Sequence, residues 1–156
     1  MCAGISLSWR DFPVQLVEQH LLQDRKVVRL EGADWEIRFL FRDPLPLIPA
    51  WHGERLDVYP WGNTDRRSKL PRTGWVKMQD LEAGYWNQLR PEQVDIPASF
   101  GLDKGVWFQI REGIRGILVL DEKGQAHVYM LTEPASHYYE VMTRNRWMPV
   151  FVGSRI

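Results

Sequence analysis

The chain has 156 residues, 44% of them hydrophobic, which is enough for one domain with a buried core. Twenty Lys and Arg residues balance twenty Asp and Glu residues, so no overall positive field attracts nucleic acid. No apolar run approaches the roughly 20 residues of a membrane-spanning helix, and the single cysteine excludes an internal disulfide. We therefore expect one cytoplasmic domain over residues 1–156, with no membrane partner.

The first half of the chain predicts one helix followed by strands. Asp11 is a suitable N-cap for the helix, and apolar residues recur after it at helical spacing. Pro44, Pro46 and Pro49 exclude a helix from the segment around them. The expected elements are a helix at 12–24, strands at 26–31, 35–41 and 56–59, and an extended or sheet-edge segment at 42–53.

The second half predicts an irregular basic loop, a helix and then mostly strands. Apolar residues at helical spacing end at Pro91, which cannot continue a helix. Glycine-containing turns are expected at 101–105, 112–113 and 122–124. The expected elements are a loop at 63–75, helices at 78–89 and 134–143, and strands at 93–98, 106–111, 114–120, 126–131 and 148–152. Together these elements predict an α+β fold: a curved, mostly antiparallel sheet or open β-barrel with two to three flanking helices.

The sequence contains no pattern typical of a metal or nucleotide site. The four histidines are far apart, and Cys2 has no second cysteine within metal-ligand spacing. Phosphate-binding glycine loops and the nucleophile elbow are also missing. We expect no metal and no cofactor.

Cys2 is the residue with the most distinctive chemical setting. If Met1 is removed, a free α-amine with a pKa near ~7.7–8.0 stands next to a thiol with a pKa near ~8.5. Such a 1,2-aminothiol condenses with an aldehyde to a five-membered thiazolidine, which no internal cysteine can form. The alternative is an incidental cysteine near a chain end.

The densest basic stretch contains Arg66, Arg67 and Arg72 and ends near Lys77. It is typical of a solvated loop, and it is also a candidate phosphate-binding surface. Trp61 and Trp75 lie in Pro/Gly-rich connections, where they either pack in the core or stack on bases.

A series of segments resembles, in order, the motifs of the SOS-response-associated peptidase (SRAP) family of abasic-site-processing proteins. They are Met1-Cys2, FRDPLPLIP, YPWGN, VDIPASFGLD, VWFQI, GILVL, YMLTEPAS and RWMPVFV. The resemblance implies a single SRAP-like domain that binds single-stranded DNA in the cytoplasm. It also implies a covalent thiazolidine link between Cys2 and the ring-opened aldehyde of an abasic site, with possible thiol peptidase or lyase activity.

The resemblance also assigns roles to individual residues. Cys2 matches the nucleophile, and Asp103 falls at the position of the catalytic Glu, where it would shuttle protons. Arg72 matches the DNA-binding Arg, with Arg66, Arg67 and Lys77 as further phosphate ligands and Trp61 or Trp75 against bases. For the family His, Asn145 aligns from the Met148-Pro149 side, whereas His137 is the only imidazole nearby; it either reaches the site or lies on an exposed helix face.

Two other functions remain open. Leu70 and Gly74 stand where the family has Asn and Glu, which favours a member that has lost its chemistry and acts as a non-covalent single-stranded DNA binder or a protein-interaction module. A true thiol peptidase would need a base to activate the thiol, and the sequence shows no Cys–His pairing. A monomer is the favoured oligomeric state.

Overall fold

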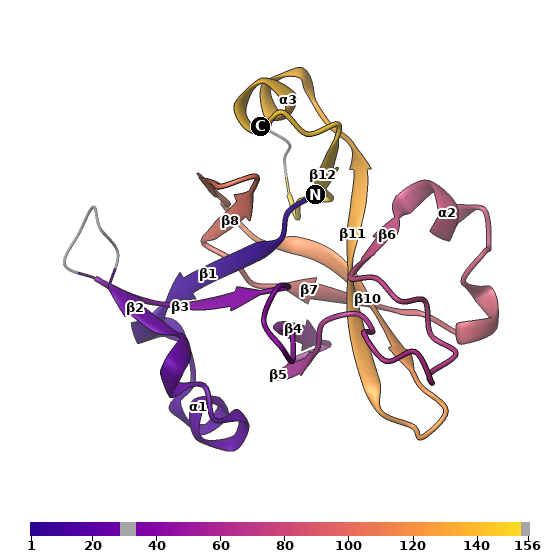
Figure 1. Cartoon of the computed structure of the whole chain (residues 1–156), viewed down its shortest axis with the longest axis horizontal. Coiled ribbons are helices and arrows are strands. Elements are labelled where there is room, and N and C mark those ends of the chain that lie inside the picture. Colours follow the sequence, from indigo (N-terminus) through magenta and orange to yellow (C-terminus); the bar gives the residue numbers. More distant parts are fainter. Residues whose placement is uncertain (29–33, 154–156) are drawn as a thin grey trace.

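The computed structural model describes residues 1–28 and 34–153. It is an α+β fold with two mostly antiparallel sheets and flanking helices (Figure 1), which confirms the expected fold class. The first sheet contains, in spatial order, β2 (Lys26–Val28), β3 (Trp35–Leu40), β1 (Gly4–Ser8), β8 (Phe100–Asp103) and β9 (Val106–Gln109). The second contains, in spatial order, β12 (Trp147–Pro149), β11 (Ala126–Pro134), β10 (Ile114–Leu120), β7 (Glu92–Ile96), β4 (Leu47–His52) and β5 (Arg55–Pro60).

A short strand, β6 (Trp75–Lys77), pairs in parallel with β11 at the edge of the main path of the second sheet. The α-helices are α1 (Val14–His20), α2 (Met78–Glu82) and α3 (His137–Thr143). Figure 1 shows the N-terminus beside β12 and close to α3. No helix in the described ranges is long and apolar enough to span a bilayer.

The central strand of the first sheet, β1, is not among the strands expected from the sequence. It pairs antiparallel with β3 on one side and with β8 on the other. Ile5 points into the core, while Ser6 belongs to the opposite face of the sheet. Ile5 and Leu7 alternate with Ser6 and Ser8, which is a strand pattern, but the pattern is short. The neighbours of β1 in the sheet are distant in sequence.

The expected helices are shorter in the structure. The helix expected at 12–24 is α1, which begins after Pro13 and ends where Leu21 adopts a left-handed φ of 56°; Asp11 is therefore not its N-cap. The helix expected at 78–89 is interrupted after α2, and Gly84 has a φ of +87°. In α3 the Ser136 hydroxyl accepts a hydrogen bond from the Tyr139 N–H and caps the helix.

Most of the expected strands are present with shifted ends. Residues 29–31 of the first expected strand lie outside the described ranges, and 35–41 and 114–120 correspond to β3 and β10. The turn expected at 101–105 is wrong over 101–103, because β8 continues to Asp103 and the turn contains only Lys104 and Gly105. Asp103 is therefore held on a paired strand.

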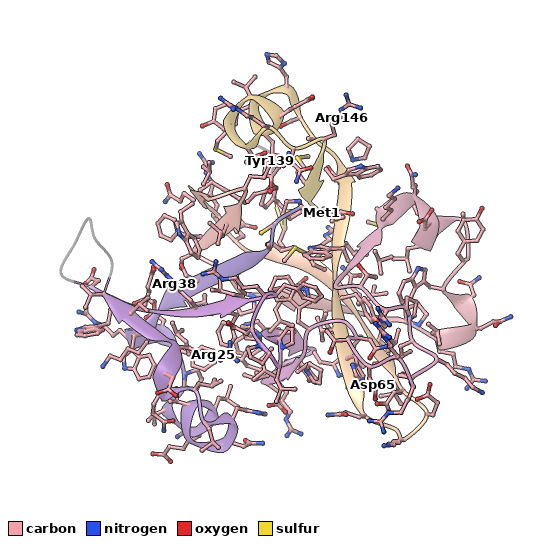
Figure 2. All side chains as sticks on the ribbon, viewed as in Figure 1. Met1, Arg25, Arg38, Asp65, Tyr139 and Arg146 are labelled. Carbon is pink, nitrogen blue, oxygen red and sulfur yellow. The ribbon has the colours of Figure 1, made fainter. Side chains whose placement is uncertain are left out.

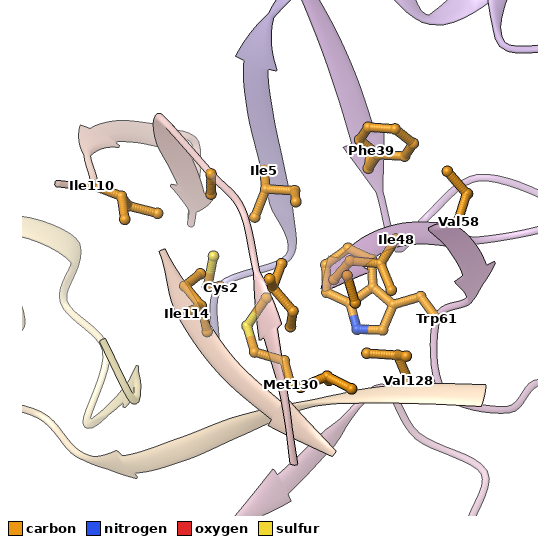
Figure 3. Close-up of a cluster of buried hydrophobic side chains, with 14 of the residues drawn as sticks. Cys2, Ile5, Phe39, Ile48, Val58, Trp61, Ile110, Ile114, Val128 and Met130 are labelled. Atoms are coloured by element: carbon orange, nitrogen blue, oxygen red, sulfur yellow. The ribbon is translucent and has the colours of Figure 1, made fainter. Parts of the chain in front are cut away.

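One core cluster contains side chains from both sheets. Ile5 and Phe39 of the first sheet pack in the same cluster as Ile48 and Val128 of the second (Figure 3). Trp61 belongs to this cluster and is 1% exposed, with its indole N–H donating to the Gly74 carbonyl at 3.0 Å. The two sheets are thus packed against each other over a shared apolar interior.

Candidate functional site

Strand pairing brings the N-terminal residues to Asp103. Gly4 of β1 is opposite Leu102 of β8, and the Ala3 N–H donates to the Leu102 carbonyl at 2.7 Å. The chain before Gly4 consequently passes the end of β8. The α-amine of Met1 lies 3.4 Å from Oδ1 of Asp103 and forms an ion pair with it.

The Asp103 carboxylate is fully buried and receives hydrogen bonds from two further elements. The Tyr139 hydroxyl, on α3, donates to Oδ2 at 2.5 Å. The Asn145 amide, just after α3, donates to both oxygens at 3.1 and 3.3 Å. Burial, with the bond to Asp103 as a second cause, raises the pKa of Tyr139, so the phenol remains a donor. A buried carboxylate is tolerable because it has this set of donors.

Cys2 is placed by the same pairing, with its side chain in the interior. The thiol is 0% exposed and donates to the Gly4 carbonyl at 3.2 Å. Figure 3 shows Cys2 in the buried cluster near Ile114. Burial, and secondarily the charge of Asp103, raises the pKa of the thiol to about 12. At neutral pH the thiol is therefore protonated.

Strand β6 forms another side of the site. The Trp75 indole N–H donates to the carbonyl of Cys2 at 2.9 Å, which fixes the backbone of the second residue. Two residues later, the ammonium of Lys77 lies 4.4 Å from the ring centroid of Trp147. Two of the predicted DNA-binding residues are therefore near the site: Trp75 contacts Cys2, and Lys77 contacts Trp147, two residues after Asn145.

The other predicted DNA-binding arginines belong to the connection before β6. Arg66, Arg67 and Arg72 are exposed on the connection between β5 and β6. Arg67 pairs with Asp65 at 3.4 Å, and the Asn63 amide donates to the Leu70 carbonyl at 2.9 Å. Figure 2 shows Asp65, in this loop, well away from Met1. Arg66 and Arg67 directly follow Asp65, so the structure does not bring these two arginines to Cys2. Arg72 is three residues before Trp75, at the other end of the same connection.

The loop is anchored by His127 and Asp121 at the end of the β10–β11 hairpin. One ring nitrogen of His127 contacts the Gly62 carbonyl at 2.7 Å, and the other contacts the Asp121 carboxylate at 2.9 Å. The hydrogen bond from His127 is the largest of several causes that lower the pKa of Asp121 below its ordinary value. Both imidazole nitrogens are therefore engaged in holding the loop, and the pair is structural.

Two other predicted site residues have clear placements. Trp61 is enclosed by the core, so in this conformation its ring cannot stack on a base. His137 is exposed at the start of α3, which agrees with the exposed-face alternative. The position next to Asp103 is instead occupied by Asn145, whose side-chain oxygen Oδ1 also accepts from the Trp147 N–H at 3.2 Å.

Tyr139 is the site residue that sequence reasoning did not find. Tyr139 lies between the segments YMLTEPAS and RWMPVFV. Its position three residues after the N-cap Ser136 does not indicate a role in a site. Asn145 had an alignment signal, but an amide was not expected to replace an imidazole. In the described ranges no group of three or more His, Cys, Asp or Glu residues could hold a metal ion.

The arrangement combines an amine, a carboxylate and a thiol at the edge of the core. The α-amine of Met1, a residue that is 46% exposed, can reach a solvent-borne electrophile, while the Asp103 carboxylate can exchange a proton with it.

Comparisons with the models of known protein families, with curated proteins and with solved structures find no match for this chain.

Proposed function

We propose that the protein is a divergent SRAP-like sensor that captures abasic sites in single-stranded DNA through Cys2 once that residue is first in the chain. The observation that carries this proposal is the ion pair between the terminal amine and the buried Asp103 carboxylate at 3.4 Å. A carboxylate held by Tyr139 and Asn145 beside a chain terminus suits proton transfer at an amine. The cytoplasm, where the lone thiol stays reduced, is the proposed location.

The proposed chemistry balances without an oxidant or a metal. Asp103 accepts a proton from the Cys2 ammonium, and the free amine adds to the aldehyde carbon of the opened sugar. The protonated carboxyl returns the proton to the departing oxygen, so that water leaves and an imine forms. The S–H of Cys2 then adds across the C=N bond: a C–S bond forms, the proton goes to nitrogen, and a thiazolidine results.

The complete burial of the Cys2 sulfur counts against direct attack by the thiol, so the proposal requires the amine to react first. The thiol and the amine of one cysteine are joined through Cα and Cβ, so an imine carbon formed on the amine is delivered to the sulfur from within the residue. The sulfur does not need its own path from solvent. Its raised pKa, about 12, keeps it from reacting as a free thiolate before the imine exists.

A second candidate is a non-covalent single-stranded DNA binder or protein-interaction module. It is favoured by the complete burial of the Cys2 thiol and by Leu70 and Gly74 at positions where the family has polar residues. The two candidates differ in one observable property, the survival of the complex under denaturing conditions.

The test uses protein that begins at Cys2, released from a fusion by a protease that leaves no extra residue. It is mixed with a single-stranded oligonucleotide carrying one abasic site and run on a denaturing gel. We expect a heat-stable product with wild type and none with Cys2→Ala. Asp103→Asn should form the product more slowly, by roughly 10²-fold or more, because the proton shuttle is lost.

Borohydride reduction separates the two functional groups. With reductant present, Cys2→Ala should still be trapped, because its α-amine can form the imine even though no thiol can close on it. If wild type gives no product with or without reductant but shifts the oligonucleotide in a native gel, the non-covalent candidate is correct.

A further inference from the structure

The outward face of the first sheet carries polar, aromatic and cationic side chains. Because side chains alternate along a strand, Gly4 and Ser6 of β1 belong to the face opposite Ile5. Ser6 is flanked by Arg38 of β3 on one side and Phe100 of β8 on the other. Figure 2 shows Arg38 on the sheet that contains the N-terminal strand.

The guanidinium of Arg38 is held in a defined orientation. Its Nε donates to Oε1 of Glu36 at 2.6 Å, and the Ser6 hydroxyl donates to the other Glu36 oxygen at 3.2 Å. Glu36 is buried, so this is a fixed carboxylate and not a surface partner. The guanidinium carbon also lies 4.7 Å from the ring centroid of Trp107 on β9. Arg38 is thus fixed by a carboxylate at one edge and an aromatic ring at its face.

This orientation leaves the two terminal nitrogens of Arg38 as the outer edge of the group. Within residues 1–28 and 34–153, the polar partner of its guanidinium is Glu36, through Nε. Arg38 is 31% exposed although it is fixed at its base. A planar pair of N–H donors held in this way fits the oxygens of a phosphodiester bidentately.

The position of Arg38 relative to the candidate site is set by strand register. Gly4 lies opposite Leu40 on β3, and Arg38 is the next residue on the same face of that strand. Cys2 is two residues before Gly4. A strand of nucleic acid whose damaged nucleotide reaches Cys2 would therefore have its neighbouring phosphates near Arg38.

We propose that Arg38, oriented by Glu36 and Trp107, binds a backbone phosphate of the single-stranded DNA that presents its abasic site to Cys2. The proposal rests on the proposed function for its substrate class. The charge next to β3 also gives the DNA strand a direction: the residue before β3, Asp34, carries an exposed carboxylate that would repel a phosphate backbone. The DNA is therefore expected to cross the sheet at Arg38, from the side of Cys2 towards Trp107, and not to follow β3 towards Asp34.

The test measures non-covalent binding, which does not depend on Cys2 chemistry. Fluorescent single-stranded oligothymidine without damage is titrated with the full chain over a series of salt concentrations, and anisotropy is recorded. The main variant combines Glu36→Gln with Arg38→Gln, which leaves the net charge of the protein unchanged and replaces the pair by two amides that can bond to each other. We expect about tenfold weaker binding and a salt slope smaller by about 0.7, the value of one phosphate contact to a single strand.

A matched control is Arg55→Gln, because Arg55 is 82% exposed on β5 and only 3.8 Å from Asp57. It should change neither the affinity nor the slope. Unchanged affinity and slope in the double variant, or no salt-dependent binding by wild type, would overturn the inference. If circular dichroism shows that the double variant does not fold, Arg38→Lys is used instead. This variant keeps the positive charge beside Glu36 but lacks the paired N–H donors of the guanidinium. Roughly threefold weaker binding supports the proposal, and wild-type affinity refutes it.

The two proposals fail separately. Suppose that the double variant binds more weakly and that wild-type protein beginning at Cys2 gives no heat-stable product with abasic DNA. The Arg38 contact is then retained and the covalent function is rejected. A heat-stable product together with wild-type binding by the double variant would retain the covalent function and reject the Arg38 contact.

Discussion

At the scale of single residues, several hydrogen-bond donors converge on the buried carboxylate of Asp103. Asp103 contacts the terminal amine at the start of the chain, and the Tyr139 hydroxyl and Asn145 amide on and just after α3. A buried charge that loses one donor is penalised by more than the net strength of that bond, because desolvation is no longer compensated. The network therefore couples the stability of the site to the residues that surround it.

The contribution of Tyr139 can be measured against the tyrosine beside it. Tyr139→Phe removes the donor at 2.5 Å from Asp103 and should lower the free energy of unfolding by about 1.5–3 kcal/mol, the range for bonds to charged groups. Tyr138 is 63% exposed, so Tyr138→Phe should change it by less than about 0.5 kcal/mol. Urea denaturation of the two variants checks this. Equal effects would mean that the Asp103 bond is not the source of the loss.

The raised pKa of Cys2 predicts a particular loss of stability at high pH. Below its ordinary pKa of 9.0, the thiol is protonated in both the folded and the unfolded chain and has no effect on the pH dependence. Between 9.0 and about 12 the unfolded thiol ionises while the folded one does not, so the free energy of unfolding falls as pH rises. The fall is about 1.4 kcal/mol per pH unit.

This effect is isolated by comparing wild type with Cys2→Ala, because other groups such as Tyr139 titrate in both proteins. From pH 8 to pH 10.5 wild type should lose about 2 kcal/mol more than Cys2→Ala in urea unfolding. The same burial predicts that a thiol-specific reagent reacts with Cys2 at pH 8 only after unfolding. Parallel pH profiles for the two proteins would show that the thiol is not buried in solution.

At the scale of elements, the connection from β5 to β6 depends on one glycine. Gly62 has a φ of +61°, and a Cβ at this position would lie 2.0 Å from the Thr73 carbonyl oxygen. The chain leaving Trp61 and the chain arriving at β6 therefore approach each other more closely than any side chain permits. This approach lets the Trp61 indole reach the Gly74 carbonyl and closes the loop against the core.

Gly53 provides a control with the same backbone conformation. It lies in the β4–β5 hairpin with a φ of +62°, and a Cβ there would meet nothing within 4 Å. Gly53→Ala should lower the free energy of unfolding by about 1–2 kcal/mol, because alanine is strained in the left-handed conformation. Gly62→Ala should cost about 1–3 kcal/mol more, because the added carbon also overlaps backbone. Thermal or urea unfolding measures both, and similar losses would contradict the close approach.

The elements that the sequence predicts well are those with local signals. β3 and β10 alternate or run apolar between clear turn residues, and both are found at their expected places. β1 and β8 were missed or read as a turn because their stability comes from pairing with strands far away in sequence. The helices were overestimated since apolar spacing continues past Leu21 and Gly84, where a left-handed residue ends the helical backbone.

The candidate site was predictable only in part, for the same reason. Motif order placed Cys2 and Asp103 in one site, and the register of β1 and β8 brings these segments together. Arg66 and Arg67 follow the YPWGN motif closely in sequence, but the anchor formed by His127 and Asp121 at Gly62 holds the start of that loop against another part of the second sheet. Tyr139 and Arg38 acquire their roles from partners on other elements, which no local pattern records.

At the scale of the whole molecule, the start of the chain is part of the structure. β1 is the middle strand of five, and the core cluster that it contributes to includes side chains from both sheets. The terminal residues are consequently held at the junction of the first sheet with β6 and with the segment that follows α3. Met1 is nevertheless 46% exposed, so additional residues before it can extend into solvent.

This placement predicts that the covalent chemistry depends on which residue is first in the chain. Three forms are compared: a chain beginning at Cys2, one beginning at Met1, and one with a glycine before Met1. The form beginning at Cys2 should stay within about 1 kcal/mol of the Met1 form, because its own amine takes over the contact with Asp103. The glycine-extended form moves the amine away from the buried carboxylate and should be about 1–3 kcal/mol less stable. Only the form beginning at Cys2 should give a heat-stable product with abasic single-stranded DNA, since the other two tie the Cys2 amine into a peptide bond. A heat-stable product from the glycine-extended form at the same rate would show that another nucleophile is responsible, and a large loss of stability in the Cys2 form would show that Met1 is a structural residue.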